Sequence, residues 1–234
     1  MEKRRIEQSP KGTRMLIGVG EEADIYYYLD GLLKDHIGRV VRGEEHYAPN
    51  TQKINLQRYR MHQIAHLLYP QYNLDVRGVD LEDGEMYSLQ VVRSKDNLRD
   101  AVSRGLSRRK QRSELPMLPQ AKAAAKEMAE GGVIVHTGFV NASVRGDEVM
   151  FFEVVNIVPD KAMTRLTEGY PADVVEKGRP LIDAFRLERD ISDIELHLML
   201  SDPKERMRIL KDHGMERLET LYSRELGSNV NVEK

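Results

Sequence analysis

The feature that most constrains the fold is a series of short β-forming runs and turns around a single helical segment in residues 14–93. The runs are rich in β-branched and aromatic residues, and the pair Asp30-Gly31 favours a tight turn between two of them. The expected strands are residues 15–20, 23–30, 32–41, 74–80 and 86–92. The helical segment, residues 54–70, has apolar residues at helical spacing and ends at Pro70. Five strands and one helix are therefore expected.

The chain becomes mostly helical in pattern over residues 94–226. An alanine-rich run at 119–132 strongly favours a helix, and Gly131-Gly132 is a typical C-terminal stop. A hairpin is expected within residues 133–155. Three residues are candidate helix N-caps: Asp190, Ser192 and Asp202. The fold class indicated by these patterns is α+β.

The ends of the chain carry weaker patterns than the middle. Residues 1–13 are expected to be a flexible leader, and residues 227–234 a frayed tail. The predicted organisation is thus a leader, a β-rich part at 14–93, a helical part at 94–226 and a tail.

Composition excludes several classes of function. The chain has no cysteine, which rules out disulfides, thiol catalysis and cysteine-ligated metal sites. Its net charge of -2 gives no general attraction to nucleic acid or acidic lipid. The charged start lacks the apolar stretch of a signal peptide, and no apolar run reaches the length of a membrane span. A cytoplasmic location without membrane contact is expected.

Residues 17–26, IGVGEEADIY, place glycines in a turn between two expected strands. Small residues there let backbone N–H groups approach the phosphates of a nucleotide. Lys34 follows on the third expected strand, where a lysine can neutralise phosphate charge. The same residues also fit a plain β-turn and a solvated lysine at a strand edge.

Residues 131–155 lead from a helix that ends in glycines, through an apolar strand to His136, and then through a hairpin to Glu153. With the glycine turn and Lys34, this order resembles the protein-kinase superfamily. The nearest members are RIO-type kinases, aminoglycoside-phosphotransferase-like proteins and the small kinase subunit of the tRNA-modifying KEOPS complex. The resemblance covers about residues 15–157. It implies a two-lobed fold, with a five-stranded N-lobe carrying one helix and a mostly helical C-lobe.

The resemblance implies ATP and Mg²⁺ as cofactors. It assigns nucleotide binding to Gly18, Gly20, Ala23 and Lys34. Aligned on His136, however, Gly138 stands at the position of the catalytic base, and Ser143 stands at that of the metal-binding asparagine. Glu153 stands at the position of the metal-binding aspartate. The candidate catalytic residues are His136, Asn141 and Glu153, and the candidate metal ligands are Glu153 and Ser143.

The helix at 54–70 also departs from the family pattern. In kinases this helix carries a glutamate that pairs with the strand lysine. The corresponding stretch here offers Arg58, Arg60, His62 and Gln63 and no acid, so the pair is missing or built differently. His62 and His66 stand four residues apart, as zinc ligands can, but ordinary helix histidines are the better interpretation.

Three hypotheses about function follow. The first is a pseudokinase-like domain that binds a protein partner and holds a nucleotide weakly or not at all. The second is an active atypical kinase, in which Lys34 binds phosphate, Glu153 holds the metal, and Asn141 or Asp147 assists. The third is a nucleic-acid-binding module that uses the basic segment 99–112. Its cations are Arg99, Arg104, Arg108, Arg109, Lys110 and Arg112.

Overall fold

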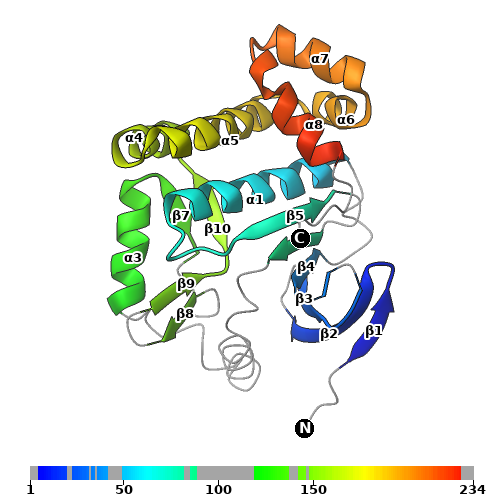
Figure 1. Cartoon of the computed structure of the whole chain (residues 1–234), viewed down its shortest axis with the longest axis vertical. Coiled ribbons are helices and arrows are strands. Elements are labelled where there is room, and N and C mark those ends of the chain that lie inside the picture. The colour runs from blue at the N-terminus through cyan, green and yellow to red at the C-terminus, as the bar shows by residue number, and fades with distance from the viewer. Residues whose placement is uncertain are drawn as a thin grey trace.

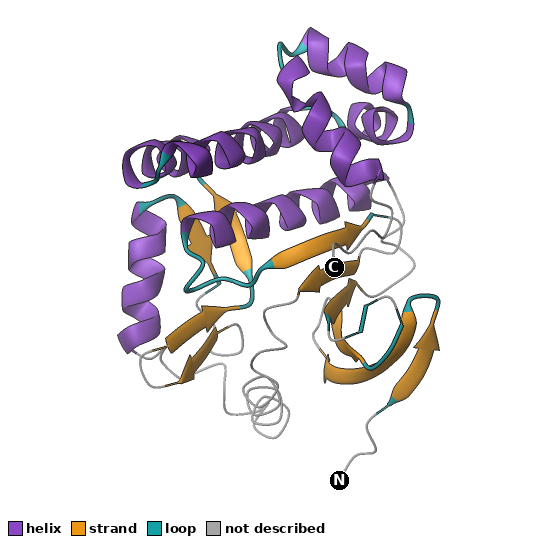
Figure 2. Cartoon of the chain, viewed as in Figure 1, coloured by secondary structure: helices purple, strands orange, loops and turns teal. Residues whose placement is uncertain are grey.

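The computed structural model of the chain has an α+β architecture, with one large sheet and a group of helices in separate parts of the molecule (Figure 1; Figure 2). The expected class is confirmed. The structure describes residues 5–19, 23–31, 33–34, 36–41, 49–81, 85–88, 119–136, 142–145 and 148–227. Its strands are β1 (Ile6–Ser9), β2 (Gly12–Val19), β3 (Ala23–Tyr28), β4 (Ile37–Val41), β5 (Val76–Asp80), β6 (Glu85–Ser88), β7 (Val133–Val135), β8 (Ala142–Arg145), β9 (Glu148–Phe151) and β10 (Val154–Ile157). Its helices are α1 (Pro49–Leu68), α3 (Pro119–Glu130), α4 (Pro159–Gly169), α5 (Ala172–Asp190), α6 (Asp193–Ser201), α7 (Pro203–Asp212) and α8 (Glu219–Gly227), with a 3-10 turn η4 (Glu216–Leu218).

The large sheet has six strands in the order β1-β2-β3-β4-β6-β5, and every neighbouring pair is antiparallel. Five strands were expected, and β1 is the additional one. Residues 6–9 were predicted to lie in a flexible leader, which is wrong, because they pair with β2 from Ile6 opposite Met15 to Ser9 opposite Gly12. Two smaller sheets pair β10 with β7 and β8 with β9.

The connection between β3 and β4 is longer than the sequence indicates. Asp30 accepts two hydrogen bonds from Thr13, one from the backbone N–H and one from Oγ1, both at 2.7 Å. Gly31 has a φ of 75°, which glycine adopts without steric cost. The strands pair again only where the backbone N–H of Tyr28 donates to the carbonyl oxygen of His36. The third expected strand therefore begins at Ile37 and not at residue 32.

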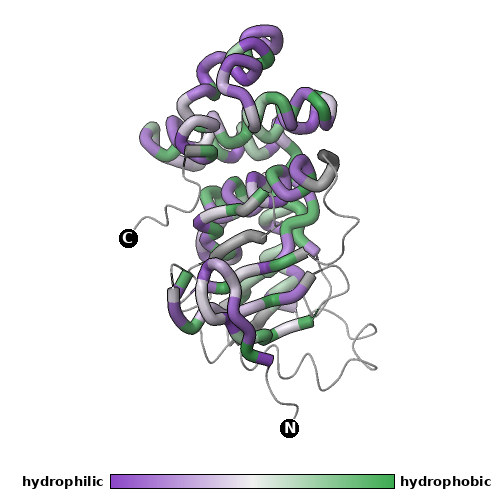
Figure 3. The backbone as a smooth tube through the Cα atoms, turned by 90° about the vertical axis from the view of Figure 1, so that its right-hand side faces the viewer, coloured by the Kyte–Doolittle hydropathy of each residue, from purple (hydrophilic) through white to green (hydrophobic). Residues whose placement is uncertain are grey.

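Helix α1 lies between the sheet and the later helices, with α5 on one side and β5 on the other (Figure 1). It begins five residues before the predicted segment and ends before Pro70, as expected. Its inner residues join the largest apolar core, which also contains side chains of α3, α4, α5, β7, β9 and β10. Figure 3 shows hydrophobic and hydrophilic positions alternating along the helices, as expected for helices that bury one face.

The predicted stop of α3 is confirmed, because the helix ends directly before Gly131 and Gly132. Gly132 has a φ of 85°, and a Cβ at this position would lie 2.8 Å from the backbone nitrogen of Ala162. The carbonyl oxygen of Gly132 accepts a hydrogen bond from the N–H of Val158, directly before α4. The glycine thus allows α3, β7 and α4 to approach one another closely.

The C-terminal part is helical, as predicted. Ser192 caps α6 in a capping box with Glu195, and Asp202 caps α7 by accepting from the N–H of Lys204. Asp190 is not an N-cap, since it is the last residue of α5. The predicted frayed tail falls almost wholly on residues 228–234, outside the described residues. Among the described residues, no helix combines the length and apolar character that a membrane span requires.

Candidate functional site

The expected nucleotide loop lies at one end of the β2–β3 hairpin. Gly18 is in β2 opposite Ile25, next to a register shift after Leu16, and Ala23 is the first residue of β3. Gly20 lies outside the described residues. The structure therefore brings Gly18 and Ala23 to the same end of one hairpin.

Lys34 is not on a strand, contrary to expectation. It lies in the turn before β4, is exposed, and donates its backbone N–H to the carbonyl oxygen of Gly31 at 3.2 Å. Ala23 pairs with Val41, whereas Lys34 precedes Ile37 at the opposite end of the same strand pair. A strand rises roughly 13 Å over the four residues from Ala23 to Tyr27, and Tyr27 pairs with Ile37. Lys34 is therefore far from the glycine turn.

A different basic residue lies in the same row of the sheet as Gly18, two strands away. Gly18, Ile25 and Arg39 are direct cross-strand partners in one row of the sheet. Directly opposite side chains lie on the same face of a sheet, and so do residues two apart on one strand. Arg39 therefore shares a face with Ile25 and with Ile37, the next residue but one on β4. Sequence reasoning missed Arg39, although a basic residue after the apolar start of a third strand was a signal that could have identified it.

This face of the sheet is covered by the chain that follows β9. Ile37 is buried, and the partly buried residues packed against its cluster are Ile17, Ile25, Tyr27, Leu74 and Phe152. Phe152 directly precedes Glu153, which is half-buried between β9 and β10. The expected metal-binding position is therefore attached to a segment that packs on the same face as Arg39.

His136 and Glu153 are brought together through their backbones. The N–H of His136 donates to the carbonyl oxygen of Glu153 at 3.0 Å, and the His136 residue is exposed. Ser143 lies on a different strand pair, opposite Met150 on β9. Asn141, with Gly138 and Asp147, lies outside the described residues.

Helix α1 presents His62 to the sheet. Residues two apart on a helix are separated by about 200° around its axis, and Arg60 points toward α5 through Glu188. His62 therefore points the other way, and it is only 6% exposed. Burial, together with the positive charges of Arg39 and Arg58, lowers the pKa of His62 to about 4. The imidazole is consequently neutral at pH 7.

The arrangement offers limited support for a bound metal ion. Within the described ranges, no three histidine, aspartate or glutamate side chains gather closely enough to hold a metal. Glu153 and Ser143 as metal ligands therefore stay predictions. The pairing of His62 with His66 as zinc ligands is not favoured either, since the His66 Nδ1 contacts the carbonyl oxygen of Asn73 at 3.0 Å.

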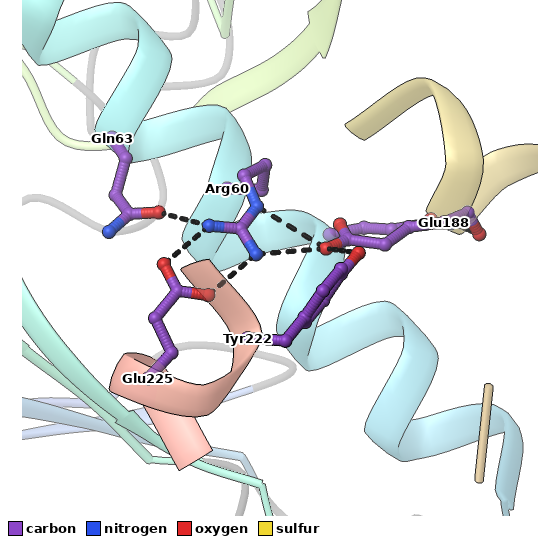
Figure 4. Close-up of polar contacts among 6 residues, drawn as sticks. Arg60, Gln63, Glu188, Tyr222 and Glu225 are labelled. Carbon is purple, nitrogen blue, oxygen red and sulfur yellow. Dashed lines mark hydrogen bonds and ion pairs between the residues drawn. The ribbon is translucent and has the colours of Figure 1, made fainter. Parts of the chain in front are cut away.

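A buried ionic cluster lies on the other side of α1 (Figure 4). Arg60 is fully buried and donates to Glu188 at 2.9 Å and to Glu225 at 2.6 and 2.7 Å. It also donates to Gln63, and Tyr222 donates its hydroxyl to Glu188 at 2.9 Å. The cluster thus joins α1, α5 and α8. Sequence reasoning missed it, because nothing in the local pattern links residues so far apart.

Protonation in this cluster follows from burial and pairing. Burial by itself would lower the pKa of Arg60, but the carboxylates of Glu188 and Glu225 raise it well above its ordinary value. Burial raises the pKa of Glu188, and the nearby Arg60 charge opposes that rise. Burial and the Glu188 charge raise the pKa of Tyr222 well above 10. Arg60 is therefore charged and Tyr222 neutral, which identifies the cluster as a structural ion pair network.

The fold and the site define an α+β protein with a glycine-containing hairpin and, on α1, a buried neutral histidine. Comparison with protein-family models and with curated protein sequences finds no match. The basic segment 99–112 lies outside the described residues, so the proposed nucleic-acid contact through Arg104, Arg108, Arg109, Lys110 and Arg112 stays a prediction. The function is therefore inferred from the site itself.

Proposed function

We propose that this chain is a pseudokinase-like domain that binds a nucleotide, has lost efficient phosphoryl transfer and acts by binding a protein partner. In this proposal the molecule has two lobes, formed by residues 14–93 and 94–226, with the nucleotide between them. The glycine turn of β2 and β3 contacts the phosphates.

One observation carries the proposal: the order in which the elements occur around α1. Five strands of the sheet follow the order β2-β3-β4-β6-β5, and α1 is inserted between β4 and β5. After α3 come β7, the β8–β9 hairpin and β10, which returns to pair with β7. In a kinase, a glycine loop, a third-strand cation, a helix, a catalytic loop and a metal-binding segment follow one another along a comparable series of elements. The agreement over so many elements supports a shared architecture.

Arg39 fits the phosphate-binding role better than Lys34. It lies on the third strand of the series, in the row of Gly18 and on the face covered by Phe152. A guanidinium can neutralise phosphate oxygens and form two parallel hydrogen bonds to them. Lys34 is the alternative phosphate-binding residue, and the thermal-unfolding experiment described below includes a variant of each.

The substituted positions support a loss of catalysis. Glycine at 138 cannot accept the proton of an attacking hydroxyl, and serine at 143 is a weak magnesium ligand. On α1 the side chain near Arg39 is the neutral His62 and not a carboxylate. In this proposal, Arg39 with the neutral His62 therefore replaces the lysine–glutamate ion pair that positions the phosphate-binding cation in kinases.

An atypical kinase is the second candidate. It is favoured by the hydrogen bond that brings His136 next to Glu153, since a carboxylate in this position could hold a metal. In this version Asn141 or Asp147 assists Glu153. Measurable release of the γ-phosphate with Mg²⁺ distinguishes it from the binding domain.

The proposed function is tested by thermal unfolding of the full chain with ATP, ADP and GTP, each with and without Mg²⁺. A ligand at one hundred times its dissociation constant adds about 2.7 kcal/mol, or roughly 5–10 °C for a chain of this size. We expect a shift with nucleotide that Arg39→Gln removes and that exposed Arg179→Gln retains. Lys34→Ala is expected to change it little.

Parallel assays of γ-phosphate release separate the two candidates. Nucleotide binding with no release above a buffer blank supports the pseudokinase-like domain. Magnesium-dependent release that Glu153→Gln abolishes supports the atypical kinase. No shift with any of the three nucleotides would overturn nucleotide binding.

A further inference from the structure

Strand β1 is the outermost strand of the large sheet. The sheet order places β2 on one side of β1 and no other described strand on the opposite side. Figure 1 shows β1 along the outer border of the curved sheet, near the N-terminus. A free sheet edge presents backbone groups that can pair with a further strand. What this edge can bind depends on which of its residues face outward.

The orientation of the backbone groups along β1 follows from its pairing with β2. The carbonyl oxygen of Arg5 accepts a hydrogen bond from the N–H of Leu16 at 2.9 Å, so Arg5 belongs to a hydrogen-bonded pair. Inward and outward orientation alternates along an antiparallel strand. Arg5 and Glu7 therefore direct their backbone groups to β2. Ile6 and Gln8 direct theirs to the free edge.

The side chains along this edge carry opposite charges on either side of an apolar residue. Arg5 is 72% exposed, and its Nε lies 3.2 Å from a carboxylate oxygen of Glu7. Glu7 also pairs with Arg14 on β2 at 2.7 Å, which holds the carboxylate in place. Ile6 lies between them in the sequence and is 59% exposed. The order cation, isoleucine, carboxylate is complementary to itself when a second strand runs antiparallel.

Only one register suits two copies of β1 that pair around a twofold axis. An axis at Arg5 or at Glu7 would place like charges directly opposite each other, which is destabilising. An axis at Gln8 would place Ile6 opposite Pro10, which has no N–H to donate. An axis at Ile6 places Arg5 opposite Glu7 of the partner subunit. This is a non-hydrogen-bonded pair, in which opposite side chains approach most closely.

We infer that two copies of this chain associate through β1, in an antiparallel pair centred on Ile6 that joins their two large sheets. The Ile6 N–H of each copy donates to the carbonyl oxygen of Ile6 of the partner subunit, and Arg5 pairs with Glu7 of the partner subunit. The exposed Ile6 side chains lie opposite each other and lose contact with water. The contact is short, so the dimer is weak and its population depends on concentration. The inference does not depend on nucleotide binding.

Disulfide cross-linking of the full chain tests the register, because the chain has no cysteine and a single introduced thiol is unambiguous. In the inferred dimer the two copies of position 6 are directly opposite, with Cα atoms about 5.5 Å apart, which a disulfide can span. The two copies of position 8 are four residues apart along the strands, or roughly 13 Å, which a disulfide cannot span. In oxidised glutathione, Ile6→Cys should therefore form a covalent dimer about tenfold faster, or more, than the matched control Gln8→Cys.

Sedimentation equilibrium of the native full chain over a range of concentrations measures the association itself. Ile6→Pro removes an N–H that points away from β2, so it should weaken the dimer and leave the hairpin intact. Arg5→Glu places like charges opposite each other in both symmetric pairs and should weaken the dimer about tenfold or more. Arg179→Glu makes the same charge change at an exposed position of α5 and should leave the dimer unchanged.

A mixture of two variants completes the test. Glu7→Arg should also dissociate the dimer, but mixing it with Arg5→Glu restores opposite charges in both pairs, so the mixture should associate where neither variant does alone. Three results would each overturn the inference: a native chain that stays monomeric up to roughly 1 mM, a dimer that Ile6→Pro and Arg5→Glu leave intact, and cross-linking of Gln8→Cys as fast as that of Ile6→Cys. A monomeric chain would leave the proposed nucleotide binding unaffected.

Discussion

The environment of His62 makes this residue a source of pH-dependent stability. It is buried on the sheet side of α1, and Arg39 and Arg58, whose charges act on it, are positive. Protonation would therefore add a third positive charge to a buried space. The folded state excludes this proton until the solution is strongly acidic.

The first prediction concerns stability against acid. The pKa of His62 falls from 6.5 to about 4 on folding, so between these values the unfolded chain binds a proton that the folded chain does not. The contribution of the neutral His62 side chain to stability is complete above pH 6.5 and is lost as the pH falls to about 4. The free energy of unfolding should drop by about 3 kcal/mol from this group. Urea unfolding at several pH values measures it.

The control for this prediction is His62→Phe. The buried Nδ1 of His62 has no hydrogen-bond partner among the described residues. Replacing this polar ring by an apolar one of similar shape should change stability by less than about 1.5 kcal/mol at pH 7. The variant should then lose less stability than wild type between pH 6.5 and 4. Equal losses in the two proteins would show that His62 does not titrate as described.

At the scale of elements, the contact of α1 with α5 and α8 includes a buried arginine with two carboxylate partners. Arg60 lies between Glu188 and Glu225, and removal of the arginine would leave two carboxylates without its positive charge. Breaking a buried ion pair from one side costs about 3–5 kcal/mol. The second prediction is that Arg60→Met lowers the free energy of unfolding by this amount.

A compensated variant tests the cause of that loss. If uncompensated charge is responsible, adding Glu188→Leu and Glu225→Leu to Arg60→Met should recover most of the stability. Denaturant unfolding of the single and triple variants gives the comparison. A triple variant no more stable than Arg60→Met would contradict the electrostatic explanation and favour lost packing instead.

The packing of α5 on its neighbours leads to the third prediction. A Cβ on Gly178 would lie 2.5 Å from Leu67 and 2.7 Å from Leu166. Overpacking costs about 1–3 kcal/mol, whereas glycine to alanine in a helix gains about 1 kcal/mol. Gly178→Ala should therefore give a net loss of about 1 kcal/mol in thermal unfolding.

Gly169→Ala is the matched control, because the nearest atom to its Cβ would be the flexible end of Arg165 at 3.4 Å. This change should leave the protein as stable as wild type or slightly more stable. If Gly178→Ala is the more stable variant of the two, the close packing described here is absent in solution.

Which elements could be predicted from sequence depends on where their causes lie. The stop of α3 and the cap at Ser192 arise from residues next to the helix end, and both predictions were correct. Strand β1 is charged and short, and only its pairing with β2 makes it a strand. The start of β4 could not be predicted either, because Asp30 is held by Thr13 and the turn is thereby lengthened.

At the scale of the whole molecule, the same division applies to the candidate site. The glycine turn and the approach of His136 to Glu153 follow from the order of segments along the chain. The position of Arg39 opposite Ile25 follows from strand register, which no local pattern in this sequence fixes.

The fourth prediction concerns where a nucleotide binds in the assembled molecule. Hydrogen exchange of the full chain, with and without saturating ATP, tests the central claim most directly, because bound ligand slows exchange of the amides it covers. The account predicts added protection in β2, β4 and the α1 segment around His62, reduced by Arg39→Gln. Protection confined to α6, α7 and α8, or none at all, would contradict a nucleotide site between the sheet and α1.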